Sequence, residues 1–180
     1  MAKTSGGLRA DKNALAKALA NTENAIRGGD YESLGVFDSK GRRLVFATGD
    51  KSSVGVTAEE EKYLRNAIVT HNHPRGTSFS SGDLKTMVAF NSKELRVVTK
   101  DYTYSMKRPK GGWGKDVDSM HKTITDIYWR KFNELGKYQS AYKGNKDVAR
   151  IRANQLHHHL FSKEVAKTFG WEYTKMRVKK

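Results

Sequence analysis

The chain has 180 residues and no cysteine, which excludes disulfides and thiolate metal sites and leaves the redox compartment open. No apolar run approaches the length of a membrane span, and the first residues lack the apolar core of a secretion signal, so we expect a cytoplasmic chain with no membrane partner. The formal net charge is +15, and residues 101–180 hold 18 of the 34 Lys and Arg but 8 of the 19 acidic residues, which favours a polyanion or an acidic protein surface as partner.

The first elements along the chain are a helix and a hairpin. Residues 8–26 contain good helix formers, and Gly28-Gly29 ends the pattern. This predicts an N-terminal helix that packs on a sheet or across a functional cleft. Residues 31–38 and 43–48 are typical of two strands, and residues 39–42 between them predict a hairpin turn.

A second helix start follows the hairpin. Thr57-Ala58-Glu59-Glu60 has the spacing of a capping box and predicts a helix that runs to about Ala67. Residues 66–70 end in a β-branched run that is typical of a strand. Pro74 ends this strand, because proline has no N–H for the ladder.

Two histidines, His71 and His73, directly follow that run. Side chains two residues apart in an extended segment point to the same side, so both imidazoles are expected to face one point. Ten residues after His73 comes Asp83, whose carboxylate can be a third ligand. Three protein ligands with one position left for water is the arrangement of a catalytic zinc. The sequence therefore predicts a Zn²⁺ site at these three residues.

Asp83 also stands at a predicted helix start. Ser80 and Asp83 have the spacing of an N-cap and its N3 acid, and Leu84, Met87 and Val88 form a helical apolar stripe. The two roles do not exclude each other, because one residue can start a helix and bind a metal. The alternative for the histidines is a turn with two solvated imidazoles.

The rest of the chain predicts two strands and then helices. Residues 95–99 and 102–106 have the composition of strands, and the glycine-rich segment 110–114 predicts a flexible joint. Helices are expected over residues 115–135 and 145–169.

These elements predict an α/β fold in which a mixed sheet is sandwiched by helices. We expect an N-terminal helix in residues 1–29 and a metal-binding core in residues 30–108. Residues 115–180 are expected to be a basic helical extension that ends in a short strand.

The residues His71-Asn72-His73-Pro74, Ser80 and Asp83 resemble the signature of the JAMM/MPN+ metallopeptidases, also called JAB domains. In that family a distant glutamate precedes His-x-His-Pro and Ser-x-x-Asp. The short loop between Pro74 and Ser80 and the residues around it resemble those of bacterial and phage members of the family. The resemblance covers about residues 30–105 and implies a JAB/MPN-like fold, a zinc cofactor, and hydrolysis of a peptide or isopeptide bond in a protein or peptide substrate. It also points to a phage or mobile element, and hence to the host cytoplasm or a virion.

The resemblance implies two catalytic roles. Glu32, at the start of the first predicted strand, matches the glutamate that takes the proton of the zinc-activated water. Ser80 matches the serine that hydrogen-bonds the oxyanion, with Ser81 as the adjacent alternative. Glu59–Glu61 are rivals of Glu32, but a capping box and a first helical turn already explain them. For Glu32 the alternative is an exposed strand glutamate.

His157-His158-His159 suggest a second metal site at first sight. Consecutive helical residues point about 100° apart, so the three cannot easily meet one ion. We expect these histidines to pack among apolar neighbours or to face a partner. His121, alone on a predicted helix, is expected to be structural too.

Two further functions stay open: a basic nucleic-acid-binding module on a JAB scaffold, and a phage head-associated structural protein that retains the metal. The first rests on the basic charge and on interleaved aromatic residues, which can stack bases. Its alternative is a solvated basic face with aromatic residues in the core. The candidate nucleic-acid-binding residues are Lys107, Arg108, Lys110, Lys175, Arg177, Lys179 and Lys180.

Overall fold

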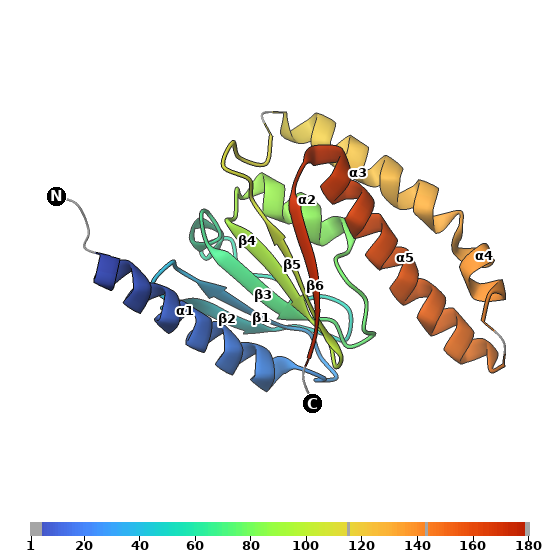
Figure 1. Ribbon diagram of the computed structural model, residues 1–180, viewed down its shortest axis with the longest axis horizontal. Helices are drawn as coiled ribbons and strands as arrows, with labels where there is room; N and C mark the ends of the chain where they lie inside the picture. Colours follow the sequence, from blue (N-terminus) through green and yellow to red (C-terminus); the bar gives the residue numbers. More distant parts are fainter. Residues whose placement is uncertain (1–4, 115, 143, 179–180) are drawn as a thin grey trace.

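A six-stranded mixed sheet organises the chain (Figure 1). The computed structural model describes residues 5–114, 116–142 and 144–178. The strands lie in the order β2-β1-β3-β4-β5-β6; β3 and β4 pair in parallel and the other neighbours are antiparallel. The predicted α/β class with a mixed sheet is confirmed. The strands are β1 (Ser33–Phe37), β2 (Arg43–Thr48), β3 (Ile68–Asn72), β4 (Glu94–Val98), β5 (Tyr102–Lys107) and β6 (Glu172–Arg177).

Helices cover both faces of the sheet. Figure 1 shows α1 along one side and α2, α3 and α5 on the other, where α3 and α5 lie side by side. Strand alternation decides what each face buries: Val69 and Val97 belong to the large cluster under α2, whereas Ile68 packs with Leu19 of α1. The helical elements are α1 (Ser5–Ile26), a short 3-10 turn η1 (Glu61–Tyr63), α2 (Ser81–Ala89), α3 (Val117–Phe132), α4 (Leu135–Ser140) and α5 (Lys146–Phe169).

The N-terminal helix α1 packs on the sheet, on the face opposite α2. Leu19 packs against Phe37 and Ile68 in a small apolar cluster. A buried ion pair adds to this contact, because Arg96 of β4 donates to both carboxylate oxygens of Glu23, one of them at 3.1 Å. The helix was expected to pack either on the sheet or across a functional cleft, and it packs on the sheet.

The helix predicted over residues 57–67 is wrong. The capping box itself forms, since the N–H of Thr57 donates to Oε2 of Glu60 at 2.9 Å, but turns and the single turn η1 follow it. Within residues 57–67 only Leu64 and Ala67 are buried, so no apolar stripe holds a helix against the sheet. Asn66, with a positive φ of 58°, leads instead into β3.

The predicted C-terminal helices are confirmed as α3 and α5, with Lys115 outside the described residues. The segment expected to separate them contains the extra helix α4. Asn145 caps α5, and Gly170, at φ 69°, ends it in the left-handed conformation that glycine adopts without strain. The predicted short final strand is β6, and it pairs with β5. In the described ranges, no helix combines the length and the apolar character needed to cross a membrane.

The buried core crosses the joint predicted near residue 110. Trp113 and Trp171 are both buried, with ring centroids 4.8 Å apart in an edge-on arrangement. Nε1 of Trp171 donates to the carbonyl of Trp113 at 3.1 Å, and Nε1 of Trp113 donates to that of Ser92 at 2.7 Å. Phe161 and Val165 of α5 belong to the same apolar cluster as the strands. The domain division stays a prediction, but the packing is shared across it.

Replacing Trp171 by Ala is expected to lower the free energy of unfolding by about 3–5 kcal/mol, because it removes a large buried side chain from this shared core. Urea denaturation followed by circular dichroism measures the change. Trp129→Ala is the matched control: that side chain is 54% exposed, and its loss should cost only about 0.5 kcal/mol. Equal, small effects of both changes would contradict the shared core.

Candidate metal centre

The end of β3 and the start of α2 bring three predicted ligands together. His71 lies in β3, His73 directly follows it, and Asp83 lies in the first turn of α2. The two Nε2 atoms are 2.9 Å apart, and the carboxylate oxygens of Asp83 lie 3.4 Å from each of them. All three side chains are largely buried, with exposures of 5%, 8% and 19%. Such a group can hold a metal ion.

The loop after Pro74 fixes the orientation of His73. Nδ1 of His73 lies 3.0 Å from the carbonyl of Ser78 and 3.1 Å from Oγ1 of Thr77. A carbonyl only accepts, so Nδ1 carries the proton and Nε2 keeps its lone pair for a metal. Within the described residues, Nδ1 of His71 is buried and has no hydrogen-bond partner, so no second contact fixes that ring in the same way.

Asp83 is held by the helix that it starts. The N–H of Ser80 donates to Oδ2 of Asp83 at 2.7 Å, and the N–H of Asp83 donates to Oγ of Ser80 at 3.1 Å. This reciprocal capping box confirms the predicted helix start. It also orients the carboxylate towards both imidazoles, so the cap and the candidate ligand coexist in one residue.

The three groups shift one another's protonation. Burial alone would raise the pKa of Asp83, but His71 and His73 hold that pKa far below its usual range. Burial lowers the pKa of His71, yet Asp83 outweighs it, and the pKa of His71 ends above its usual value. Burial lowers the pKa of His73 to about 4, against the opposing effect of Asp83. The ionised carboxylate of Asp83 and the neutral imidazole of His73 are suitable zinc donors as they stand, whereas zinc binding at His71 would have to displace the proton that Asp83 stabilises there.

Glu32 lines the same cavity, which has a volume of about 430 Å³. Glu32 directly precedes β1, and its N–H donates to the carbonyl of Asp50 at 2.7 Å. Burial raises the pKa of Glu32, His71 opposes that effect, and Asp83 adds to it. Glu32 is thus a buried acid beside the candidate ligands, and its alternative as an exposed strand residue does not describe the structure.

Asn72 joins the segment of Glu32 to the strand of the two histidines. Its Oδ1 accepts from the N–H of Ser33 at 2.6 Å, and its Nδ2 donates to the carbonyl of Tyr31 at 2.9 Å. These partners flank Glu32 on both sides. Asn72 therefore positions Glu32 relative to the candidate ligands, a role that no local pattern in the sequence indicates.

The residues that line the cavity distinguish between the alternative candidates for the catalytic serine and glutamate. Ser80 is part of the lining, whereas the described lining does not include Ser81 or Glu59–Glu61. His158 of α5 also lines the cavity, although its sequence context predicted only packing among apolar neighbours or a partner contact. Its Nδ1 lies 3.1 Å from the carbonyl of Phe79, which comes just before the helix cap.

The other histidines have separate surroundings. His157 is buried against Tyr128, with ring centroids 5.1 Å apart. Nδ1 of His159 lies 2.8 Å from the hydroxyl of Tyr173. His121 places Nε2 3.0 Å from the carbonyl of Lys85 on α2. Each of these rings therefore has a structural contact of its own.

The candidate nucleic-acid-binding residues lie at both ends of the β5–β6 pair. Lys107 pairs with Glu172 at 3.1 Å, and Arg177 lies opposite Tyr102 at the other end. Nζ of Lys175 lies 4.2 Å above the ring of Tyr102. The structure therefore does not gather these residues at one point. Of the remaining candidates, Arg108 donates to Asn91, Lys110 is exposed, and Lys179 and Lys180 lie outside the described residues.

Comparisons of the chain with protein-family models, with curated proteins and with solved structures found no match. The resemblance to JAB domains therefore rests on the motif residues of the sequence alone. The JAB-like fold, the zinc ion and the hydrolytic activity stay predictions.

Asn72→Asp should lower the free energy of unfolding by about 1–3 kcal/mol. The substitution keeps the shape of the side chain, but it replaces the donor that faces the carbonyl of Tyr31 with an oxygen. Urea denaturation measures the loss. Asn13→Asp, at an exposed position of α1, should change stability by no more than about 0.5 kcal/mol. Unchanged stability of Asn72→Asp would refute this role for Asn72.

Proposed function

We propose that the protein is a zinc-dependent hydrolase of the JAMM type that cleaves a peptide or isopeptide bond in a protein substrate. The observation that carries this proposal is the convergence of two imidazole Nε2 atoms and the Asp83 carboxylate, with Glu32 in the same cavity. A structural zinc is usually closed by four protein ligands, whereas a catalytic zinc has three. The three ligands here favour an enzyme over a structural protein that merely retains a metal.

Glu32 is the proposed proton carrier. A zinc ion held by His71, His73 and Asp83 would acidify a water molecule to a pKa of about 7 and polarise the scissile carbonyl. Glu32 accepts the proton of the attacking water and delivers it to the leaving amine. Burial raises the pKa of Glu32, whereas a zinc ion bound beside it would lower that pKa.

Ser80 is the proposed oxyanion partner. Its Oγ accepts the N–H of Asp83 through a lone pair, so the hydroxyl hydrogen is free to donate into the cavity. Negative charge develops on the carbonyl oxygen as the tetrahedral intermediate forms. A donor placed there contributes about 3 kcal/mol to catalysis.

Glu32→Gln should leave zinc binding intact and reduce hydrolysis by about 10²–10⁴-fold, because it removes the proton acceptor and keeps the shape. Cleavage of a fluorescence-quenched peptide library that includes lysine isopeptide branches measures turnover, and isothermal titration measures zinc affinity. Glu59→Gln is the matched control, since Glu59 is exposed and outside the described cavity lining.

The control should retain full turnover. Zinc-loaded protein that cleaves no member of the library would contradict the hydrolase proposal. Equal turnover of Glu32→Gln and the unmodified protein would instead contradict the role of Glu32.

A further inference from the structure

A second, larger groove lies beside the metal cavity. Its volume is about 1060 Å³, and it shares three lining residues with the cavity: His73, Arg75 and Asn154. One wall comes from β5, β6 and the turn after β4, and the other comes from residues 150–159 of α5. A chain that lies in this groove therefore reaches the candidate ligand His73 directly.

The groove is strongly basic. Its described lining contains one acid, Asp101. Arg150 makes an exposed contact of 3.4 Å with Asp147, which contributes little in water. In the part of the chain that the structure describes, the other cations of the groove make no ion pair. The cations come from four separate segments, so their charge suits an extended anionic ligand better than a single small anion. They are Arg75, Lys100, Arg150, Arg152 and Lys175.

The groove exists before any ligand arrives, because α5 holds the loop that forms its floor. Nε2 of Gln155 donates to the carbonyl of Arg75 at 3.1 Å. Gly76, at φ +76°, allows this approach: a Cβ there would lie 2.5 Å from the same Nε2. A preformed site loses less entropy when a flexible chain binds.

Two of the three tyrosines in the described lining of the groove are not free to stack bases, which favours a polypeptide over single-stranded nucleic acid. Bases bind such grooves by stacking on free aromatic faces. Here Lys175 covers the ring of Tyr102 at 4.2 Å. Tyr104 is 2% exposed and stacks on Tyr173, with an interplanar angle of 8°. These two tyrosines are already engaged, whereas the cations remain at the surface of the groove.

We propose that this groove binds an acidic segment of the substrate polypeptide, on one side of the bond that is cleaved at the metal centre. The second half of this statement rests on the proposed hydrolase function. The first half, the binding of an acidic chain, depends only on the charge and shape of the groove.

Fluorescence anisotropy on the full chain tests the binding. The probe is a fluorescein-labelled peptide of six Glu-Gly repeats; a Gln-Gly peptide of the same length and a twelve-residue oligo-dT are the comparisons. The Glu-Gly peptide should bind more tightly than either. Arg150→Glu combined with Arg152→Glu should weaken its binding by at least about tenfold, because charge reversal in the groove repels the carboxylates.

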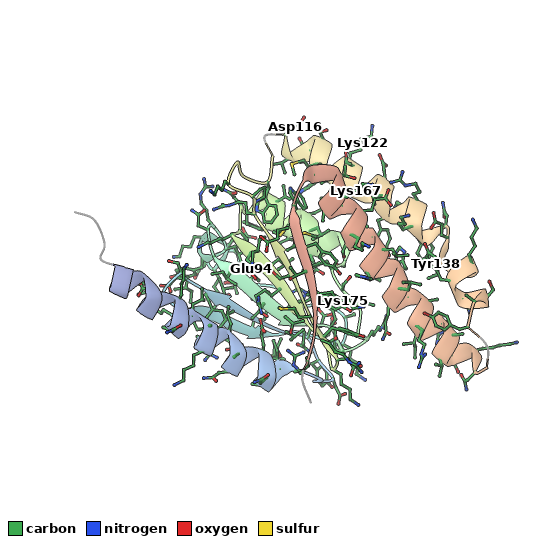
Figure 2. The ribbon with its side chains drawn as sticks, viewed as in Figure 1. Glu94, Asp116, Lys122, Tyr138, Lys167 and Lys175 are labelled. Atoms are coloured by element: carbon green, nitrogen blue, oxygen red, sulfur yellow. The ribbon has the colours of Figure 1, made fainter. Side chains whose placement is uncertain are left out.

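Lys122→Glu combined with Lys167→Glu is the matched control, with the same change in net charge. Figure 2 shows Lys122 near the start of α3 and Lys167 near the end of α5, both away from Lys175 on β6. Lys167 lies 17 residues beyond Arg150, about 25 Å along the helix. This variant should change the affinity by less than about twofold at physiological salt, because distant exposed charges are screened.

Three results would overturn the proposal: no binding of the Glu-Gly peptide, equal weakening by both double variants, or tighter binding of oligo-dT that only the groove variant abolishes. The last would assign the groove to nucleic acid. Anisotropy measures binding without turnover, so peptide binding by a protein that cleaves no substrate would contradict only the hydrolase function. Hydrolysis whose rate depends neither on the acidity of the substrate nor on the Arg150→Glu and Arg152→Glu changes would contradict only the proposed role of the groove.

Discussion

The carboxylate of Asp83 is shared between the N-terminus of α2 and two imidazoles at the end of β3, and the candidate site depends on this sharing. One oxygen accepts the N–H of Ser80, while both oxygens face a histidine Nε2. The capping box fixes the helix and the acid together, so the distance between β3 and α2 also sets the distance among the donors. The depressed pKa of Asp83 follows from the same geometry, because the imidazoles favour its ionised form.

The two faces of the sheet differ, because one packs against α1 and the other carries the candidate metal site. On the α1 side, β4 and α1 meet through the buried pair of Glu23 and Arg96. On the other side, α2 and α5 leave the metal cavity open, and α5 contributes His158 to its lining. The same helix forms a wall of the basic groove. The C-terminal part of the chain therefore contributes to the candidate site, and part of its excess positive charge lines the groove beside that site.

Local sequence signals predicted most of the helices and strands and the three side chains that converge as candidate ligands. The spacing of His71 and His73, and the cap at Ser80 and Asp83, act within a few residues, so a single sequence reveals them. The prediction of a helix over residues 57–67 was wrong because it rested on a local capping box. Whether the segment has a face to bury is decided by tertiary packing, which the local sequence does not reveal. The contacts of Asn72 with Ser33 and of His158 with Phe79 join residues 39 and 79 positions apart, and no local pattern predicts them.

Diffraction at the zinc absorption edge, on crystals grown with one equivalent of zinc, would show whether the three side chains hold the ion. We expect one anomalous peak about 2.0–2.2 Å from Nε2 of His71, Nε2 of His73 and a carboxylate oxygen of Asp83, with no fourth protein ligand. A peak at another place, a peak closed by a fourth side chain, or no peak at saturating zinc would contradict it.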